Sequence, residues 1–99
     1  MANKEKQSEE RMVVVLTEFK EIFCGWATDT EGDRIKLRNA RQACYFSEDT
    51  HGLIGLAVTG PGRGSKIGPA ANIEVRRVVN VIECSQAAAE AWEKSSWAK

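Results

Sequence analysis

The amino-acid sequence predicts an α+β domain: a small antiparallel β-sheet core with one or two helices, the last of them an alanine-rich C-terminal helix packed on the sheet. Short runs of β-branched and apolar residues are separated by clusters of turn residues, which is typical of antiparallel strands. Towards the C-terminus, Ser85 precedes a run dominated by alanine, a pattern that indicates a capped helix. The length of 99 residues suits one small domain.

The first third of the chain predicts a tail followed by two strands. Residues 1–11 are polar and are expected to be flexible, which leaves a single ligand-binding domain over residues 12–99. The unbroken apolar run Met12–Thr17 predicts a strand that is covered on both faces. Residues 22–28 predict a second strand, in which Gly25 indicates a bulge or a close backbone approach.

The next segment predicts a strand with one basic face. Between residues 34 and 38, Ile35 and Leu37 alternate with three outward-facing cations, Arg34, Lys36 and Arg38. Polar residues at 39–43 break this alternation, and a further apolar strand is expected at 44–47. The basic face is either an ordinary solvated face or a contact surface for an anionic partner.

The second half predicts a short helix, two strands and the capped C-terminal helix. Residues 51–58 fit either a strand or a helix. We favour the helix, with Asp49 or Thr50 as its N-cap, because it would end at Gly60-Pro61. Strands are expected at 72–76 and 78–84, and the final helix at 86–94, where Trp92 is expected to anchor it on the sheet.

Residues 59–69 form a glycine-rich loop. The loop holds four of the eight glycines and both prolines of the chain, two cations in Arg63 and Lys66, and the hydroxyls of Thr59 and Ser65. Glycine lets backbone N–H groups approach a ligand, and fixed positive charge then favours a phosphate. The glycine spacing matches neither the P-loop nor the dinucleotide-binding fingerprint. The alternative interpretation is a plain surface loop between two strands.

The charge distribution and the cysteines indicate what kind of partner and which cellular compartment to expect. The net charge is zero, but residues 34–77 carry eight bases against three acids, a local net charge of +5, which indicates a local anionic partner. The three cysteines are far apart and lie in apolar runs, so we expect buried free thiols in a reducing cytoplasm: Cys24, Cys44 and Cys84. No apolar run is long enough to span a bilayer, and a soluble intracellular protein is expected.

No catalytic set is visible in the sequence. His51 is the single histidine, and Glu48 and Asp49 lie in an expected turn without another carboxylate at an informative spacing. No cysteines or histidines have the spacing of metal ligands. We therefore expect a protein that binds its ligand without transforming it: not an enzyme, with no catalytic residue, metal or cofactor.

A series of motifs runs in order through about two-thirds of the chain, from Ile35 to Trp97. The motifs are Asn39-Ala40-Arg41, Tyr45-Phe46-Ser47, Gly52-Leu53 with Gly55-Leu56-Ala57, Thr59-Gly60-Pro61, Ile67-Gly68-Pro69, Ile82-Glu83-Cys84 and an alanine-rich helix with a terminal Trp. In these motifs the sequence resembles the type one family of phage Thoeris anti-defence sponge proteins. The family tends to have Tyr-Trp where this chain has Tyr45-Phe46, so this ring would stack less strongly.

The resemblance implies a phage protein that captures the cyclic ADP-ribose-type signal of bacterial Thoeris defence, in the cytoplasm of the infected host, without cleaving it. It also implies binding of cyclic di- or trinucleotides by some members, and a homo-oligomer built from dimers. The phosphates of such a ligand need N–H, Arg or Lys donors, and its purine needs an aromatic or Arg plane. The expected ligand-binding residues are Asn39, Arg41, Tyr45, Phe46, Thr59, Gly60, Pro61, Arg63, Ser65 and Lys66.

Two other classes of function remain open. The first is a small phage nucleic-acid-binding accessory protein that uses the basic face at residues 34–38. Aromatic residues interleaved with that strand would favour it, and the sequence lacks them. The second is a structural or interaction protein of phage particles. In every case we expect an oligomer, because the core is small and the chain carries three Trp residues and a strand that is apolar on both faces.

Overall fold

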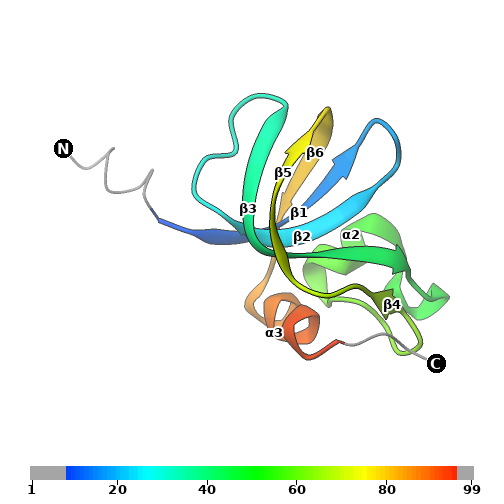
Figure 1. The fold of residues 1–99 in the computed structure, drawn as a ribbon. Coiled ribbons are helices and arrows are strands. Elements are labelled where there is room, and N and C mark those ends of the chain that lie inside the picture. Colours follow the sequence, from blue (N-terminus) through cyan, green and yellow to red (C-terminus); the bar gives the residue numbers. More distant parts are fainter. Residues whose placement is uncertain (1–8, 96–99) are drawn as a thin grey trace.

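The computed structural model describes residues 9–95, so residues 1–8 of the tail expected over residues 1–11, and the terminal Trp97, lie outside the described residues. The last residue of the expected tail, Arg11, already belongs to the first strand. Six strands and two α-helices follow one another along the chain, with one short 3-10 turn between them (Figure 1). The elements are β1 (Arg11–Thr17), β2 (Ile22–Ala27), β3 (Arg34–Tyr45), η1 (Glu48–Thr50), α2 (Gly52–Val58), β4 (Lys66–Ile67), β5 (Ala71–Arg76), β6 (Val78–Glu83) and α3 (Gln86–Lys94).

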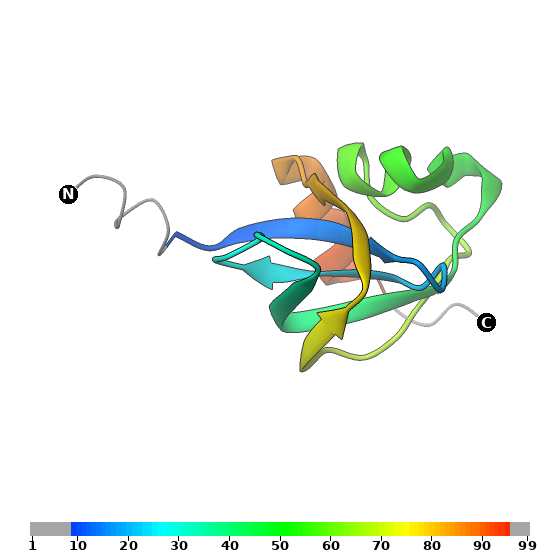
Figure 2. The same ribbon diagram turned by 90° about the horizontal axis from the view of Figure 1, so that it is seen from above.

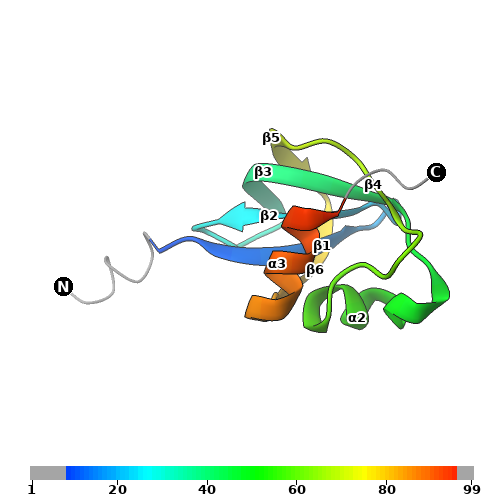
Figure 3. The ribbon, with the colours of Figure 1, turned by 90° about the horizontal axis from the view of Figure 1, so that it is seen from below.

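All strand pairs are antiparallel, and the α+β class expected from the sequence is confirmed. The strand order is β4-β3-β2-β1-β6, and β5 pairs with β3 outside this path. Viewed from above and from below, the sheet is strongly curved and both helices lie on the same side of it (Figures 2 and 3). The C-terminal helix packs on the sheet, as expected.

Strand β3 is one continuous strand of twelve residues. The expectation that residues 39–43 interrupt it was wrong. Asn39 takes a left-handed conformation, with φ of 52°, which bends the strand without ending it. β5 pairs with the part of β3 before the bend and again at Ala40 just beyond it, and β2 pairs with β3 on both sides of the bend, at Arg38 and at Arg41. β4 pairs with the end of β3 only. The polar residues at 39–43 suggested a break. The strand continues because its pairing partners come from segments that are remote in the chain, which the local sequence does not show.

Two buried clusters meet at β1, whose residues alternate between them. Met12 and Val14 face a cluster that includes Leu56 of α2 and Trp92 of α3. Val13 and Val15 face a cluster that strands alone enclose, so the expectation of cover on both faces is confirmed. Burial of one such valine contributes about 1.5–3 kcal/mol. The members of the strand-enclosed cluster are Val13, Val15, Ala27, Ile35, Leu37, Ala40, Val75 and Val78.

The C-terminal helix begins as the sequence predicts. The Ser85 hydroxyl oxygen accepts a hydrogen bond from the Ala88 N–H, 3.0 Å away. Trp92 is fully buried and anchors the helix. The short helix α2 is also confirmed, but its N-cap residue is His51, with φ of 66° and no side-chain cap, rather than Asp49 or Thr50. Those two residues lie in η1, a single 3-10 turn at the place where the sequence predicts a turn.

The cysteines differ from one another in exposure. Cys24 is buried, Cys84 is half-buried and Cys44 is exposed near the end of β3, so the expectation of a buried Cys44 was wrong. Gly25 lies at an irregularity of the β2–β3 ladder, and a Cβ there would lie 3.0 Å from the Leu37 and Ala40 carbons, which confirms the close approach. Neither helix in residues 9–95 has the length and apolar character needed to cross a bilayer.

Candidate ligand-binding site

The glycine-rich loop is packed closely against the helices. Gly60 is buried with φ of 88°, and a Cβ there would lie 2.5 Å from the Cβ of Ala91 in α3. A Cβ on Gly62 would lie 2.2 Å from Oδ1 of Asp49. At both positions, neighbouring atoms of the protein leave no room for a side chain, so packing alone explains why the residue is glycine.

Most backbone N–H groups of this loop have acceptors within the protein. Gly60 donates to the Gly55 carbonyl, Gly62 to the Thr50 hydroxyl at 2.8 Å, and Gly68 to the Gln42 carbonyl at 2.9 Å. The buried Ser65 hydroxyl accepts from the Ser47 N–H at 3.1 Å. These hydrogen bonds use the donors that a phosphate would need, so the loop is less suited to hold an anion than its composition indicates.

A shallow hollow of about 350 Å³ remains beside the loop. Its cations are Arg63 and Lys94, at the end of α3, and Pro61 and Ser65 also line it. This hollow therefore brings together three of the expected ligand-binding residues. Among residues 9–95 it has no aromatic lining residue, and its two cations suit a phosphate.

Arg41 holds three parts of the chain together. Its Nε donates to the Gly68 carbonyl at 2.7 Å, its Nη1 to the Trp92 carbonyl at 2.8 Å, and its Nη2 to the Ile67 carbonyl at 3.3 Å. The Trp92 carbonyl belongs to the last turn of α3, where the helix dipole favours a cation, and it also accepts a hydrogen bond from the Ser95 N–H at 3.2 Å. These contacts give Arg41 a structural role that the sequence did not predict.

The other expected residues are scattered. Tyr45 is exposed at the end of β3, opposite Lys66 of β4. Phe46 packs against the buried cluster that contains Leu56 and Trp92. The Thr59 hydroxyl donates to the Gly55 carbonyl at the end of α2. Asn39 is exposed at the bend of β3, where its N–H donates to the Asn72 side-chain oxygen at 3.0 Å. The ten expected residues therefore do not form one pocket.

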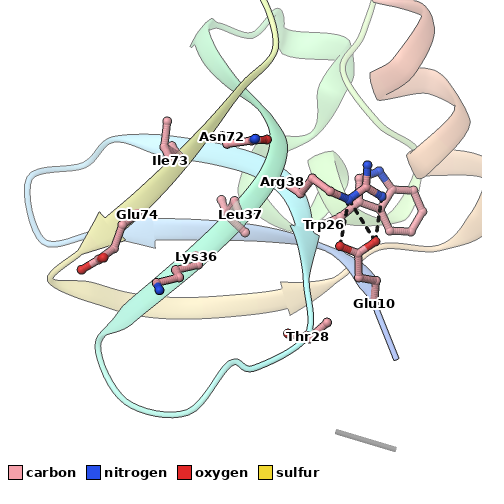
Figure 4. Close-up of a pocket in the computed structure, with 9 residues that line it drawn as sticks. All are labelled: Glu10, Trp26, Thr28, Lys36, Leu37, Arg38, Asn72, Ile73 and Glu74. Carbon is pink, nitrogen blue, oxygen red and sulfur yellow. Dashed lines mark hydrogen bonds and ion pairs between the residues drawn. The ribbon is translucent and has the colours of Figure 1, made fainter. Parts of the chain in front are cut away.

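A larger hollow, of about 480 Å³, lies over β2, β3 and β5 (Figure 4). Trp26, Arg38 and Glu10 lie together at one end of it, and Lys36 and Glu74 lie at the other (Figure 4). The sheet register explains this arrangement: Trp26 of β2 lies opposite Arg38 of β3, and Lys36 lies opposite Glu74 of β5. The full lining set is Glu10, Trp26, Thr28, Lys36, Leu37, Arg38, Asn72, Ile73 and Glu74.

Arg38 is the central group of this hollow. Its guanidinium lies over the Trp26 ring, 5.9 Å from the ring centroid. It also donates to both Glu10 carboxylate oxygens, through Nε at 2.8 Å and 3.1 Å and through Nη2 at 2.7 Å. These hydrogen bonds lower the pKa of the Glu10 carboxyl and raise the pKa of Arg38. Arg38 thus already holds a carboxylate in the geometry that would suit a phosphate.

The hollow contains what a nucleotide requires: an indole plane, two cations and the Asn72 amide. The sequence identified Lys36 and Arg38 as part of a basic face, but it gave no sign of Trp26 or Asn72 beside them. Only the strand register places an aromatic ring next to the basic strand, because Trp26 is twelve positions earlier in the chain. The expected Asn39 is a neighbour of the site through its bond to Asn72.

The acidic and histidine side chains of the described residues are dispersed. Within residues 9–95, no three His, Cys, Asp or Glu side chains gather where they could hold a metal ion. His51 is exposed in the turn between η1 and α2, with φ of 66°. The larger hollow presents groups that can stack, pair charges and form hydrogen bonds: Trp26, Arg38, Lys36 and Asn72.

Residues 10–92 match the protein family described as a domain of unknown function, DUF6948, and the chain belongs to that family. The match begins at Glu10 and ends at Trp92, so it covers all six strands and both α-helices, except for the last two residues of α3. No curated protein and no solved structure matches the chain.

Proposed function

We propose that this member of the DUF6948 family binds and sequesters a small anionic nucleotide of the cyclic ADP-ribose type, without cleaving it. By capturing the signal, it would block Thoeris defence in the infected host. The single observation that carries the proposal is the Arg38–Trp26 pair, which lies in an open hollow of about 480 Å³. The guanidinium carbon of Arg38 is 5.9 Å from the centroid of the Trp26 ring. Volumes of about 300–1,000 Å³ are usual for small-molecule sites.

The ligand's parts correspond to groups in the hollow. A purine would stack on the Trp26 indole after the Arg38 guanidinium, which now lies over that ring, turns to a phosphate, and Lys36 would contact the other phosphate. The Asn72 amide would bond a ribose hydroxyl or a base edge. Leu37 and Ile73 add apolar lining. The smaller hollow beside Arg63 and Lys94 would hold a further phosphate through its two cations.

Sequestration is favoured over turnover by the kind of groups that line the hollow. Arg38 stays protonated, since its pKa is raised. Glu10, whose pKa is lowered by Arg38, is a poor proton acceptor. Donors and a shaped surface suffice for binding, and tight binding of the ground state does not accelerate a reaction.

One observation also favours nucleic-acid binding as a second candidate. The Trp26 ring lies beside a strand with three outward-facing cations, Arg34, Lys36 and Arg38. A ring among cations is the usual platform for single-stranded nucleic acid. The two functions differ in salt dependence, because a binder that tracks several phosphates loses affinity steeply with salt.

The experiment is calorimetric titration of the purified chain with cyclic ADP-ribose, and in parallel with a short single-stranded oligonucleotide at increasing salt. We expect Trp26→Leu to weaken cyclic ADP-ribose binding by about 1–3 kcal/mol, the scale of one stacked base. The matched control is Phe19→Leu, in the turn between β1 and β2, because the Phe19 ring also lies beneath a guanidinium, that of Arg77, but outside the hollow. Lys36→Gln should also weaken binding, while Lys20→Gln should not.

The fate of the ligand completes the test. Heating the complex until the protein unfolds should return cyclic ADP-ribose at its original mass, in an amount that does not exceed the number of sites. A linear or truncated product that accumulates beyond the number of chains would show turnover and overturn sequestration. If Arg63→Gln loses binding and Trp26→Leu does not, the ligand site is the smaller hollow beside Arg63 and Lys94 instead.

A further inference from the structure

Two cysteine thiols are in contact inside the molecule. The Sγ atoms of Cys24 and Cys84 are 3.8 Å apart, and both cysteines are free. Cys24 is buried in β2, and Cys84 is half-buried directly after the end of β6. Because β2 and β6 lie on opposite sides of β1, the two side chains reach towards each other over β1. Neither cysteine lines the larger hollow, so the ligand proposed there does not involve them.

A third sulfur belongs to the same place. The Cys84 N–H donates to the Met12 carbonyl at 2.9 Å, so Met12 of β1 is the direct neighbour of Cys84 across the ladder. Met12, Cys24 and Cys84 all belong to the buried cluster on the helix side of the sheet. Of the four cysteine and methionine residues in the described range 9–95, Cys44 alone lies elsewhere. Sulfur side chains are therefore concentrated on one face of β1.

The backbone separates the two cysteines too widely for a disulfide. The backbones of β2 and β6 are two strand spacings apart, roughly 9.5 Å. The Cα atoms of a disulfide lie within about 7 Å of each other. A metal ion between the sulfurs has no such restriction: two metal–thiolate bonds of about 2.3 Å, at an angle of about 110–120°, hold their sulfurs about 3.8–4.0 Å apart. The observed sulfur separation of 3.8 Å falls in this range.

We propose that Cys24, Cys84 and Met12 form a site for one copper(I) ion, bound by two thiolates and one thioether. Thiolate and thioether sulfur select soft ions, and Cu(I) accepts two or three such ligands. A structural Zn(II) site would need four ligands, whereas no three His, Cys, Asp or Glu side chains gather within residues 9–95. The ion binds as Cu(I), so no electron is transferred, and the two thiols release their protons to water.

The surroundings balance the charge of this site. Two thiolates and one Cu(I) carry one net negative charge, which is costly to bury alone. Arg41 lies opposite Cys24 in the β2–β3 ladder, and its guanidinium is fixed by backbone carbonyls that include that of Trp92. Its positive charge makes the assembly neutral. Cys84 is half-buried, so the ion reaches the thiol pair from that side.

The test is titration of the full, reduced chain with Cu(I) under nitrogen, in competition with a chromogenic Cu(I) chelator. We expect the wild-type chain to withdraw one copper ion per chain from the chelator. Cys84→Ser should lose this binding. Cys44→Ser, which removes the exposed thiol outside the cluster, is the matched control and should keep it. Retention in Cys84→Ser, loss in Cys44→Ser, or a wild-type chain that withdraws no copper would each overturn the proposal.

A second variant keeps the test decisive if Cys84→Ser fails to fold, which circular dichroism of the metal-free protein detects. Met12→Leu keeps an apolar side chain of similar size but removes the thioether. Binding should weaken about tenfold or more, because losing a partner that only orients a ligand already costs that much. X-ray absorption at the copper edge should show sulfur neighbours alone in the wild-type chain. Nitrogen or oxygen ligands, or equal affinity in Met12→Leu, would refute this ligand set.

Discussion

The Trp92 indole N–H donates to the main-chain oxygen of Leu56, 2.9 Å away, and so joins the last helix to the middle of α2. Both residues are fully buried. A buried indole N–H requires a partner, and here it satisfies a carbonyl of a short helix at the same time. Trp92 thus fixes the position of α2, and with it the start of the glycine-rich loop.

Replacement of Trp92 should separate packing from hydrogen bonding. Trp92→Phe keeps an aromatic ring but leaves the Leu56 carbonyl without its donor, at a cost of about 1–3 kcal/mol of unfolding free energy. Trp92→Ala should cost about 3–5 kcal/mol because it also leaves a cavity. Urea denaturation followed by circular dichroism measures both. Equal loss in the two variants would show that the packing of the ring adds nothing, whereas no loss in Trp92→Phe would show that the hydrogen bond contributes nothing.

Two glycines of the same loop should differ in their tolerance of alanine. Gly60 and Gly64 both have positive φ, 88° and 85°, but only Gly60 has a neighbour close to the position of a Cβ. Gly64→Ala should therefore cost about 1–2 kcal/mol for the left-handed conformation alone. Gly60→Ala should cost more, because Ala91 of α3 must also move. Thermal unfolding compares the two, and similar melting temperatures would contradict the steric explanation.

Arg41→Ala should lower stability more than it lowers ligand affinity. The substitution leaves three backbone carbonyls without their charged donor, at a cost of about 1.5–3 kcal/mol or more of unfolding free energy. Binding of cyclic ADP-ribose by the fraction that remains folded should be unchanged, since Arg41 does not line the larger hollow. A stable Arg41→Ala variant that fails to bind would instead place Arg41 in the ligand site.

Glu10→Gln should tighten nucleotide binding at neutral pH, by up to about fivefold, because it removes the carboxylate that occupies Arg38. The pKa of Glu10 is lowered by Arg38, so the ion pair stabilises the fold at pH values above the ordinary pKa of a glutamate. This contribution is lost as the pH falls through the lowered pKa. Glu9→Gln is the control for charge, and an equal gain in both variants would refute competition at Arg38.

The three thiols should react in the order of their exposure. Cys44 is exposed and should react first with an aromatic disulfide reagent, whereas Cys24 is buried, and burial raises the pKa of its thiol. We expect Cys44→Ser to remove the fast phase, and Cys24 to react only when the protein unfolds. Fast loss of two thiols in the Cys44→Ser variant would contradict this order.

Much of the local structure could be predicted from the sequence, because it depends on neighbouring residues. The Ser85 hydroxyl and the alanine run determine α3. The two-faced apolar run of β1 and the alternation of Ile35 and Leu37 with basic residues determine which faces are buried. In these cases the signal is contained within a few consecutive positions.

The tertiary structure alone determined which side chains lie together at the proposed ligand-binding site. Arg41 and the glycine-rich loop have the composition of an anion site, yet their donors are bonded to carbonyls and hydroxyls from remote segments. Trp26 and Asn72 became site residues only through the pairing of β2 and β5 with β3. The physical reason is that composition specifies which donors exist, while the strand register and the packing of the helices determine which of them still face solvent.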